Sequence, residues 1–170
     1  MTQEEMISLK IDEVKPFMAK LLANTLFDNF ILREMEIQTF TGFNVSGHFN
    51  EGFFTKEELE ERGAEKAVLW SEVKGIAFSI IRGSKTPLSM KIVFQLPRSL
   101  TDQLVESLGG RYRAEDVGGL YMNIRFENNE LRIITGTSMK TFVMDKTLDV
   151  EWDDWVRKYL ESKEIYYEEI

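Results

Sequence analysis

The chain has 170 residues, of which 43% are hydrophobic, with no cysteine, a single histidine and a formal net charge of -8 at pH 7. The negative charge works against non-specific binding to nucleic acid or to anionic membranes. The absence of cysteine excludes thiol catalysis and zinc sites built from Cys and His, and we expect no cofactor. One domain with a sizeable core fits this length, so we expect a single domain over residues 1–170 that begins with a disordered leader at residues 1–5.

The sequence predicts neither membrane insertion nor secretion. No apolar run approaches the ~18 residues of a transmembrane helix. The start of the chain, Met1–Met6, is polar and acidic, the opposite of a signal peptide. We therefore expect a cytoplasmic protein without a membrane partner.

The first third of the chain predicts a strand, a helix and two further strand segments. Residues 7–11 alternate between apolar and polar side chains and predict a strand. Apolar residues at helical spacing predict a helix over residues 13–25, with Pro16 tolerated in its first turn. From residue 35 to residue 49 the alternation predicts two strand segments, with a bend or a hairpin turn at residues 41–42.

Two helices in the middle of the chain are marked by capping residues. Thr55 and Glu58 form a capping box at the start of a short helix, and Gly63 ends it. This helix has little apolar surface, so we expect it on the outside of the protein. Ser99 is the expected N-cap of a second helix, which closes at residues 109–110.

Alternating apolar residues predict two hairpins. The first joins residues 76–80 to residues 88–96 through a turn at residues 83–87. The second joins residues 120–126 to residues 131–134. These short connections place neighbouring strands antiparallel to each other.

The last third predicts a strand and a helix. Residues 139–144 alternate and predict a further strand of the same meander. Asp149 is the expected N-cap of the last helix, with apolar residues at 152, 155, 156, 159 and 160 as its buried stripe. The tail at residues 164–170 is apolar enough to dock on a partner or on the body of the protein, although a chain terminus can also fray.

The order of these elements favours an α+β fold. We expect a largely antiparallel sheet of consecutive hairpins with about four helices around a single layer-packed core.

The only histidine, His48, is the candidate catalytic residue. On a continuous strand it shares the polar face with Gln38, Asn44, Ser46 and Asn50, and such a row can line a groove. The simpler interpretation is a solvated outer face, since the sequence marks no catalytic partner for a lone histidine.

Two other patterns have simple structural explanations. Four carboxylates at residues 149–154 lack the spacing of a calcium loop, and carboxylates are favoured in the first turn of a helix. The glycines between residues 109 and 119 match neither phosphate-binding fingerprint, so they indicate a helix stop and a connection. Arg111 and Arg113 in this connection could still contact an anion.

A cationic sheet face is the candidate binding site. Lys91 and Arg125 face away from the core, near Tyr121. If Arg132 and Lys140 join them, the face can bind an anionic ligand or single-stranded nucleic acid by charge and stacking. The alternative is a solvated face whose lysines discourage edge pairing.

Two stretches carry a resemblance: residues 70–96, with Ile-Arg-Gly-Ser-Lys-Thr-Pro-Leu at 81–88, and residues 121–155, with Thr-Gly-Thr-Ser-Met-Lys-Thr-Phe at 135–142. Over nearly its whole length the chain resembles an uncharacterised domain-of-unknown-function family of small proteins from clostridial-type bacteria, which implies no activity. Its opening strand and helix and its later strand pair also resemble parts of a sliding-clamp domain. That likeness implies an acidic protein with a cationic DNA-binding face.

These observations favour a non-enzymatic ligand-binding or interaction domain that uses the polar, cationic sheet face. The alternative is an enzyme that uses His48 in a polar groove. A third hypothesis is a subunit whose function resides in a homo-oligomer.

Overall fold

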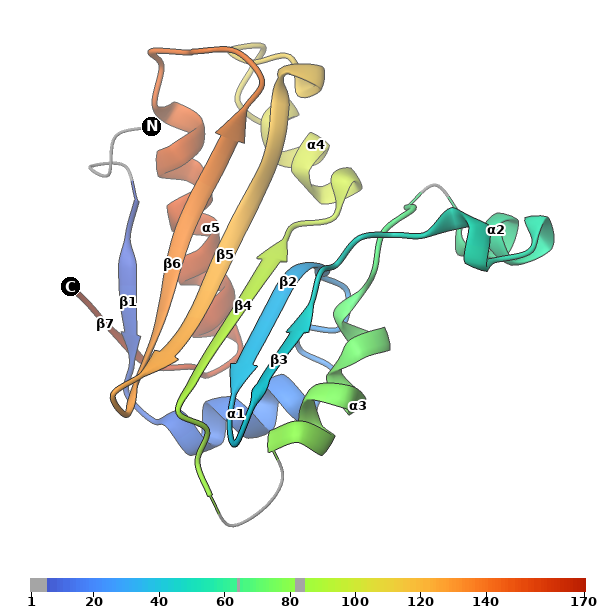
Figure 1. The fold of residues 1–170 in the computed structure, drawn as a ribbon. Coiled ribbons are helices and arrows are strands. Elements are labelled where there is room, and N and C mark those ends of the chain that lie inside the picture. The colour runs from blue at the N-terminus through green and yellow to red at the C-terminus, as the bar shows by residue number, and fades with distance from the viewer. Residues whose placement is uncertain (1–5, 64, 82–84) are drawn as a thin grey trace.

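A computed structural model describes residues 6–63, 65–81 and 85–170 (Figure 1). These residues form seven strands and five α-helices, with two short 3-10 helices, η2 (Glu51–Phe53) and η3 (Ala114–Asp116). The strands are β1 (Ser8–Ile11), β2 (Ile31–Gln38), β3 (Gly42–Val45), β4 (Ser89–Gln95), β5 (Val117–Glu127), β6 (Glu130–Met139) and β7 (Tyr167–Glu169). The helices are α1 (Val14–Leu22), α2 (Lys56–Arg62), α3 (Trp70–Ile81), α4 (Arg98–Glu106) and α5 (Thr147–Ser162).

All seven strands belong to one open sheet with the order β3-β2-β4-β5-β6-β1-β7, and every neighbouring pair is antiparallel. Helices α1, α3, α4 and α5 contribute buried side chains to the same core cluster as the strands, so they share one side of the sheet. Figure 1 shows α5 crossing behind β5 and β6. The predicted α+β class and antiparallel sheet are therefore confirmed, with one helix more than expected.

The core lies between this helix layer and the inner face of the sheet. Alternate residues of β4 are buried, as its pattern predicts. Phe94 lies at the centre, with ring centroids 5.7 Å from both Phe27 and Phe30 and 5.2 Å from Trp70. Trp70 also donates a hydrogen bond of 2.8 Å from its indole nitrogen to the Leu21 carbonyl, so its polar atom is satisfied inside the core.

The strand and helix predicted at the start of the chain are confirmed as β1 and α1, although α1 ends at residue 22. The predicted break at residues 41–42 is a hairpin turn, because Gln38 pairs with Gly42. β3 ends at Val45, however, and His48 lies beyond it in an irregular segment. The expected strand through residue 49 is therefore wrong.

The strand predicted at residues 76–80 is also wrong, because these residues belong to α3. This helix buries Trp70, Val73 and Ala77, which lie at i, i+3 and i+7 on one helical face. The local alternation is misleading, since Phe78 is 46% exposed on another face of the helix.

The strand predicted at residues 88–96 exists as β4, but it pairs with β2 and β5 instead of a strand at 76–80. The first two residues of its predicted turn, 83 and 84, lie outside the described residues. The next helix, α4, begins at Arg98 directly after Pro97, so Ser99 is not its N-cap.

The hairpin of β5 and β6 is confirmed, and Asn128 and Asn129 at its turn both have a positive φ, 52° and 62°. Asparagine is one of the residues that tolerate this left-handed conformation, and two such residues make a hairpin turn that suits twisted strands. The strand predicted at residues 139–144 is wrong, because β6 ends at Met139 and the backbone nitrogen of Lys140 donates to Asp116 in a connection.

The last helix begins earlier than predicted. α5 starts at Thr147, and the carboxylate of Asp145 accepts the Thr147 backbone hydrogen bond at 2.9 Å. Asp149 lies in the first turn instead of at the N-cap. The tail docks on the body of the protein, because β7 pairs with β1 along the edge of the sheet.

Helix α2 lies in the segment between β3 and α3, which projects from the sheet in Figure 1 and which we call the arm. The predicted capping box is confirmed by two hydrogen bonds, 2.8 and 3.1 Å, between Thr55 and Glu58. α2 buries none of its residues. The guanidinium of Arg62 lies about equally far from the rings of Phe49 and Phe54, at 5.0 and 5.1 Å, and gives the arm a small internal contact.

Candidate ligand-binding face

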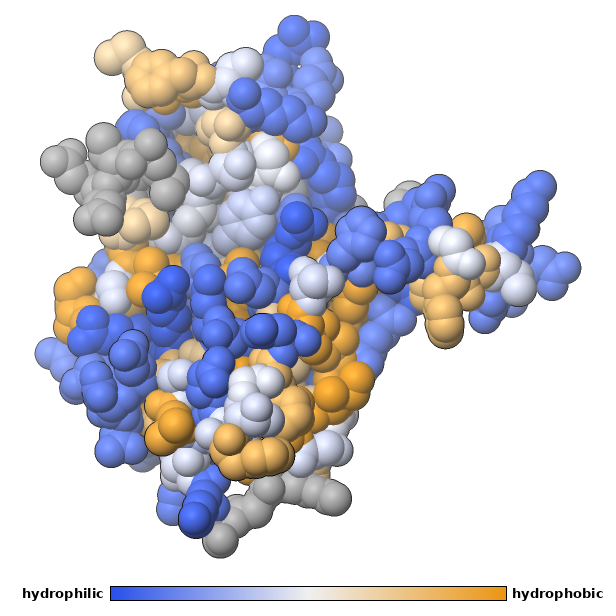
Figure 2. All heavy atoms as spheres, in the orientation of Figure 1, coloured by the Kyte–Doolittle hydropathy of each residue, from blue (hydrophilic) through white to orange (hydrophobic). Residues whose placement is uncertain are grey.

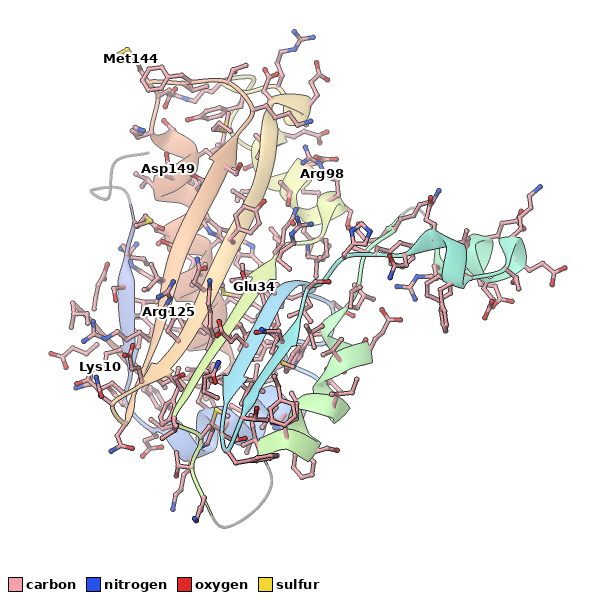
Figure 3. The ribbon with its side chains drawn as sticks, viewed as in Figure 1. Lys10, Glu34, Arg98, Arg125, Met144 and Asp149 are labelled. Carbon is pink, nitrogen blue, oxygen red and sulfur yellow. The ribbon has the colours of Figure 1, made fainter. Side chains whose placement is uncertain are left out.

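The outer face of the sheet carries four cationic residues in one line across four neighbouring strands. Lys91 of β4 pairs with Arg125 of β5, Arg125 pairs with Arg132 of β6, and Arg132 pairs with Lys10 of β1. Residues opposite each other in neighbouring strands point to the same face, so the four side chains form a row. We call these four residues the cationic row. Figure 3 shows Arg125 and Lys10 on this part of the sheet.

Carboxylates limit the row on both sides. In register with its two ends lie Glu36 of β2, opposite Lys91, and Glu168 of β7, opposite Lys10. Within the face, Glu34 lies 3.5 Å from Lys91, and Glu130 lies 2.9 Å from Arg132 and 3.5 Å from Lys10. The cationic row is therefore short and closed at its ends.

Glu130 is held in its charged form by the row. The hydrogen bond from Arg132 and the charge of Lys10 lower the pKa of this carboxyl group below its usual value. Arg125, at the middle of the row, is exposed and forms no ion pair with any residue that the structure describes. The positive charge that is free to meet a ligand is therefore concentrated at Arg125.

A neutral region extends from the row along the strands. The next outward-facing residues are Val93, Asn123 and Ile134, which lie in register on β4, β5 and β6. Beyond them come Gln95 and Tyr121. Figure 2 shows hydrophilic atoms over the middle of β4, β5 and β6 and pale ones towards the end of β6, whereas apolar atoms gather near β3 and α3 and at the edge by β1 and β7.

Tyr121 lies over the backbone of its own strand. A Cβ atom on Gly119 would be only 2.6 Å from the Tyr121 hydroxyl oxygen and 2.9 Å from the Gln95 amide nitrogen. The phenol and the amide thus share the space above Gly119, which only a glycine leaves open. Gly136, opposite Tyr121 on β6, has no side chain to cover the ring from that side.

The five predicted binding residues do not all come together. Lys91, Arg125 and Arg132 share the row, and Tyr121 faces the same side of the sheet four residues further along β5. Lys140 lies apart, beyond the end of β6, where it lines a hollow of about 240 Å³ with Tyr112, Phe142 and Asp145 among its other residues.

The sequence prediction missed Lys10, the fourth member of the row. The signal was available, because Leu9 and Ile11 on either side of it are both buried and alternation places Lys10 outward. The missing information was which strand would lie beside β6.

His48 is exposed in the segment that connects β3 to the arm, and its backbone nitrogen donates to the Ser46 hydroxyl at 3.2 Å. It lines a shallow hollow of about 200 Å³ together with Arg62 and Glu72. Glu72 is already bound by Arg62 through two hydrogen bonds of 2.7 and 2.9 Å. Among the described residues, the imidazole of His48 has no hydrogen-bonded carboxylate or hydroxyl partner.

The other candidate anion and cation sites are occupied by internal contacts. Arg111 pairs with Asp145 at 3.2 Å and Arg113 with Glu115 at 2.8 Å. No group of three His, Cys, Asp or Glu side chains with metal-binding geometry occurs in the described part of the chain.

The four carboxylates at residues 149–154 do not converge. Asp149 and Asp153 accept hydrogen bonds from Thr137 and Thr135 of β6, and Asp154 pairs with Lys158. The expected position in the first turn of a helix holds for Asp149 alone, since Asp153 is buried further along α5.

Comparison with known proteins identifies a family. A model described as a family of unknown function, DUF5721, matches residues 20–168. The chain belongs to the DUF5721 family. The match to DUF5721 agrees with the resemblance to a domain of unknown function, but it gives no taxonomic grouping. No curated protein matches the chain. No solved structure matches it either, so the sliding-clamp likeness has no support.

Proposed function

We propose that this protein is a non-enzymatic binding domain, and that the open face of its sheet binds an anionic ligand through the cationic row. The observation that supports the proposal best is the register, which aligns Lys91, Arg125, Arg132 and Lys10 across four strands. Arg125 supplies the central contact, because a guanidinium offers several donors in a planar fork that suits phosphate and carboxylate groups.

The carboxylates around the row favour a compact anionic group at this position. Glu36 and Glu168 repel a polyanion that lies across the strands, and the net charge of -8 opposes loose binding elsewhere on the surface. Binding should therefore be local and weakened by salt.

The alternative, an enzyme that uses His48, has less support. A histidine acting as a general acid or base is usually oriented by a second group, and the surroundings of His48 offer a carboxylate that Arg62 already binds. A homo-oligomer remains compatible with the binding function, and light scattering would detect it.

We also infer a cytoplasmic location. The chain lacks cysteine, which is compatible with a reducing compartment. None of the described helices is long and apolar enough to cross a membrane. A fluorescent fusion expressed in bacterial cells would show the location directly.

Calorimetric titration with tripolyphosphate at low and high salt tests the proposed binding. The double variant Lys91→Glu with Arg125→Glu should bind at least about tenfold more weakly, because two charged contacts become repulsive. The matched control is Arg113→Glu with Lys158→Glu, which changes the net charge equally at two exposed ion pairs away from the row. Equal affinity in all three proteins, or no binding to the wild type, would contradict the proposal.

A further inference from the structure

Resting on the proposed function, we infer that the anionic ligand is single-stranded nucleic acid lying lengthwise along β5. One of its phosphates contacts the cationic row at Arg125, and one of its bases stacks on Tyr121. Three properties of the face lead to this ligand: the direction that is free of carboxylates, the separation between the row and Tyr121, and the position of the Tyr121 ring.

The carboxylates leave one direction open from Arg125. Across the strands, the row ends at Glu36 and Glu168. Towards the β5–β6 turn, the next outward-facing pair is Glu127 with Glu130. In the opposite direction the residues in register on β4, β5 and β6 are neutral, up to and including Tyr121, and Glu34 of β2, opposite Val93, borders this path on one side. A negatively charged chain can therefore leave the row only along the strands towards Tyr121.

The separation between Arg125 and Tyr121 suits a ligand of more than one nucleotide. Arg125 and Tyr121 are four residues apart on β5, which corresponds to about 13 Å along a strand. The Tyr121 ring also extends towards Gly119, away from Arg125, so we expect a ligand that reaches both residues to contain at least two linked nucleotides. A free phosphate, or one nucleotide, reaches only one of the two.

The Tyr121 ring is placed for stacking. Its hydroxyl end lies above Gly119, so the ring is folded down onto the sheet instead of standing in solvent. Its backbone carbonyl accepts a 3.0 Å hydrogen bond from the Trp152 indole, which anchors this part of β5 to α5. A tethered aromatic ring on a sheet, beside a positively charged region, is the arrangement by which proteins bind single strands with little sequence preference.

Duplex DNA fits this face less well. A duplex presents phosphates on two strands and stacks its bases inside, whereas this face offers one short row and one aromatic ring. The ligand should therefore be an unpaired strand, and a duplex of the same length serves as the competing probe.

Calorimetric titrations with trithymidylate, thymidine monophosphate, tripolyphosphate and a short duplex test the inference. The trinucleotide should bind about tenfold more tightly than the mononucleotide and than the duplex. Tyr121→Ala should remove that advantage, again about tenfold, and leave tripolyphosphate binding unchanged. Tyr121→Phe should restore it, because the ring carries the stacking. Tyr166→Ala is the matched control, an exposed tyrosine on the segment before β7.

Separate outcomes distinguish this inference from the function on which it rests. If tripolyphosphate binds through Lys91 and Arg125 but the trinucleotide gains nothing over the mononucleotide, the nucleic-acid inference is wrong and the anion site remains. Tighter binding of the duplex, or equal effects of Tyr121→Ala on all probes, would also overturn the inference. If no probe binds the wild-type protein, both proposals fail.

Discussion

Asp153 is a carboxyl group that the fold removes from water. It is 7% exposed on the inner side of α5 and accepts a 2.5 Å hydrogen bond from the Thr135 hydroxyl. Burial raises its pKa to about 6, against the opposing effects of Thr135 and Arg157, while Asp149 and Glu169 add to the increase. The proton is therefore bound more tightly in the folded chain than in the unfolded chain.

Because the pKa of Asp153 is higher in the folded chain, protonation of this carboxyl group stabilises the fold. Stability that depends on protonated Asp153 is fully present below the unfolded pKa of 3.8 and is lost as the pH rises through about 6. The loss is at most about 3 kcal/mol, since one pKa unit corresponds to about 1.4 kcal/mol. Asp153→Asn should remove this part of the pH dependence and make the protein more stable than wild type at pH 7.5, as measured by urea unfolding between pH 4 and pH 8.

Asp154→Asn is the control for that measurement. Asp154 lies on the outer side of the same helix, and its hydrogen bond from Lys158 lowers its pKa. The pH dependence that it contributes has the opposite sign, because its charged form is favoured in the folded state. Identical unfolding curves for Asp153→Asn and Asp154→Asn would contradict the assignment.

At the scale of single residues, the alternation of apolar and polar residues along the strands was enough to predict which side chains face outward. Lys91 and Arg125 were predicted to lie outside because apolar neighbours flank them, and Met90, Ile92 and Ile124 are indeed buried. Lys140 could not be placed in this way, since β6 ends one residue before it. Which outward residues become neighbours depends on strand order, which a single sequence does not reveal.

At the scale of helices and strands, a prediction was right where residues close together in the sequence carried all the information that it needed. The capping box of α2 depends on two side chains three residues apart, and the structure confirms it. The strand predicted at residues 76–80 failed because a window of five residues also fits a helix. The longer spacing of Trp70, Val73 and Ala77 shows the helical period.

Thr55→Ala tests how independent α2 is. Losing the cap should cost about 1 kcal/mol in local stability and speed exchange of the Leu59 amide about fivefold. Because α2 buries no residue, the amides of β5 and the melting temperature should not change. Thr55→Ser keeps the hydroxyl and should behave as wild type. A fall in global stability after Thr55→Ala would show that the arm is coupled to the core.

At the scale of the whole molecule, the aromatic centre of the core joins α3 and the central strands. Phe94→Ala should destabilise the protein by about 3–5 kcal/mol, since a fully buried ring with three aromatic neighbours is replaced by a cavity. Phe142→Ala removes a ring that is 88% exposed and should cost less than about 0.5 kcal/mol. Chemical unfolding measures both changes, and similar values for the two variants would contradict this description of the core.

The position of β1 between β6 and β7 has a consequence for the order in which the sheet is completed. The partners of β1 lie in residues 130–139 and 167–169, more than a hundred residues along the chain. Contacts between such distant segments form late, because they close large loops. On the ribosome, Leu9 and Ile11 are made long before β7 and find their second neighbouring strand only after residue 167 has emerged. A chain released early leaves an apolar strand with an open edge, which is a surface that quality-control factors recognise.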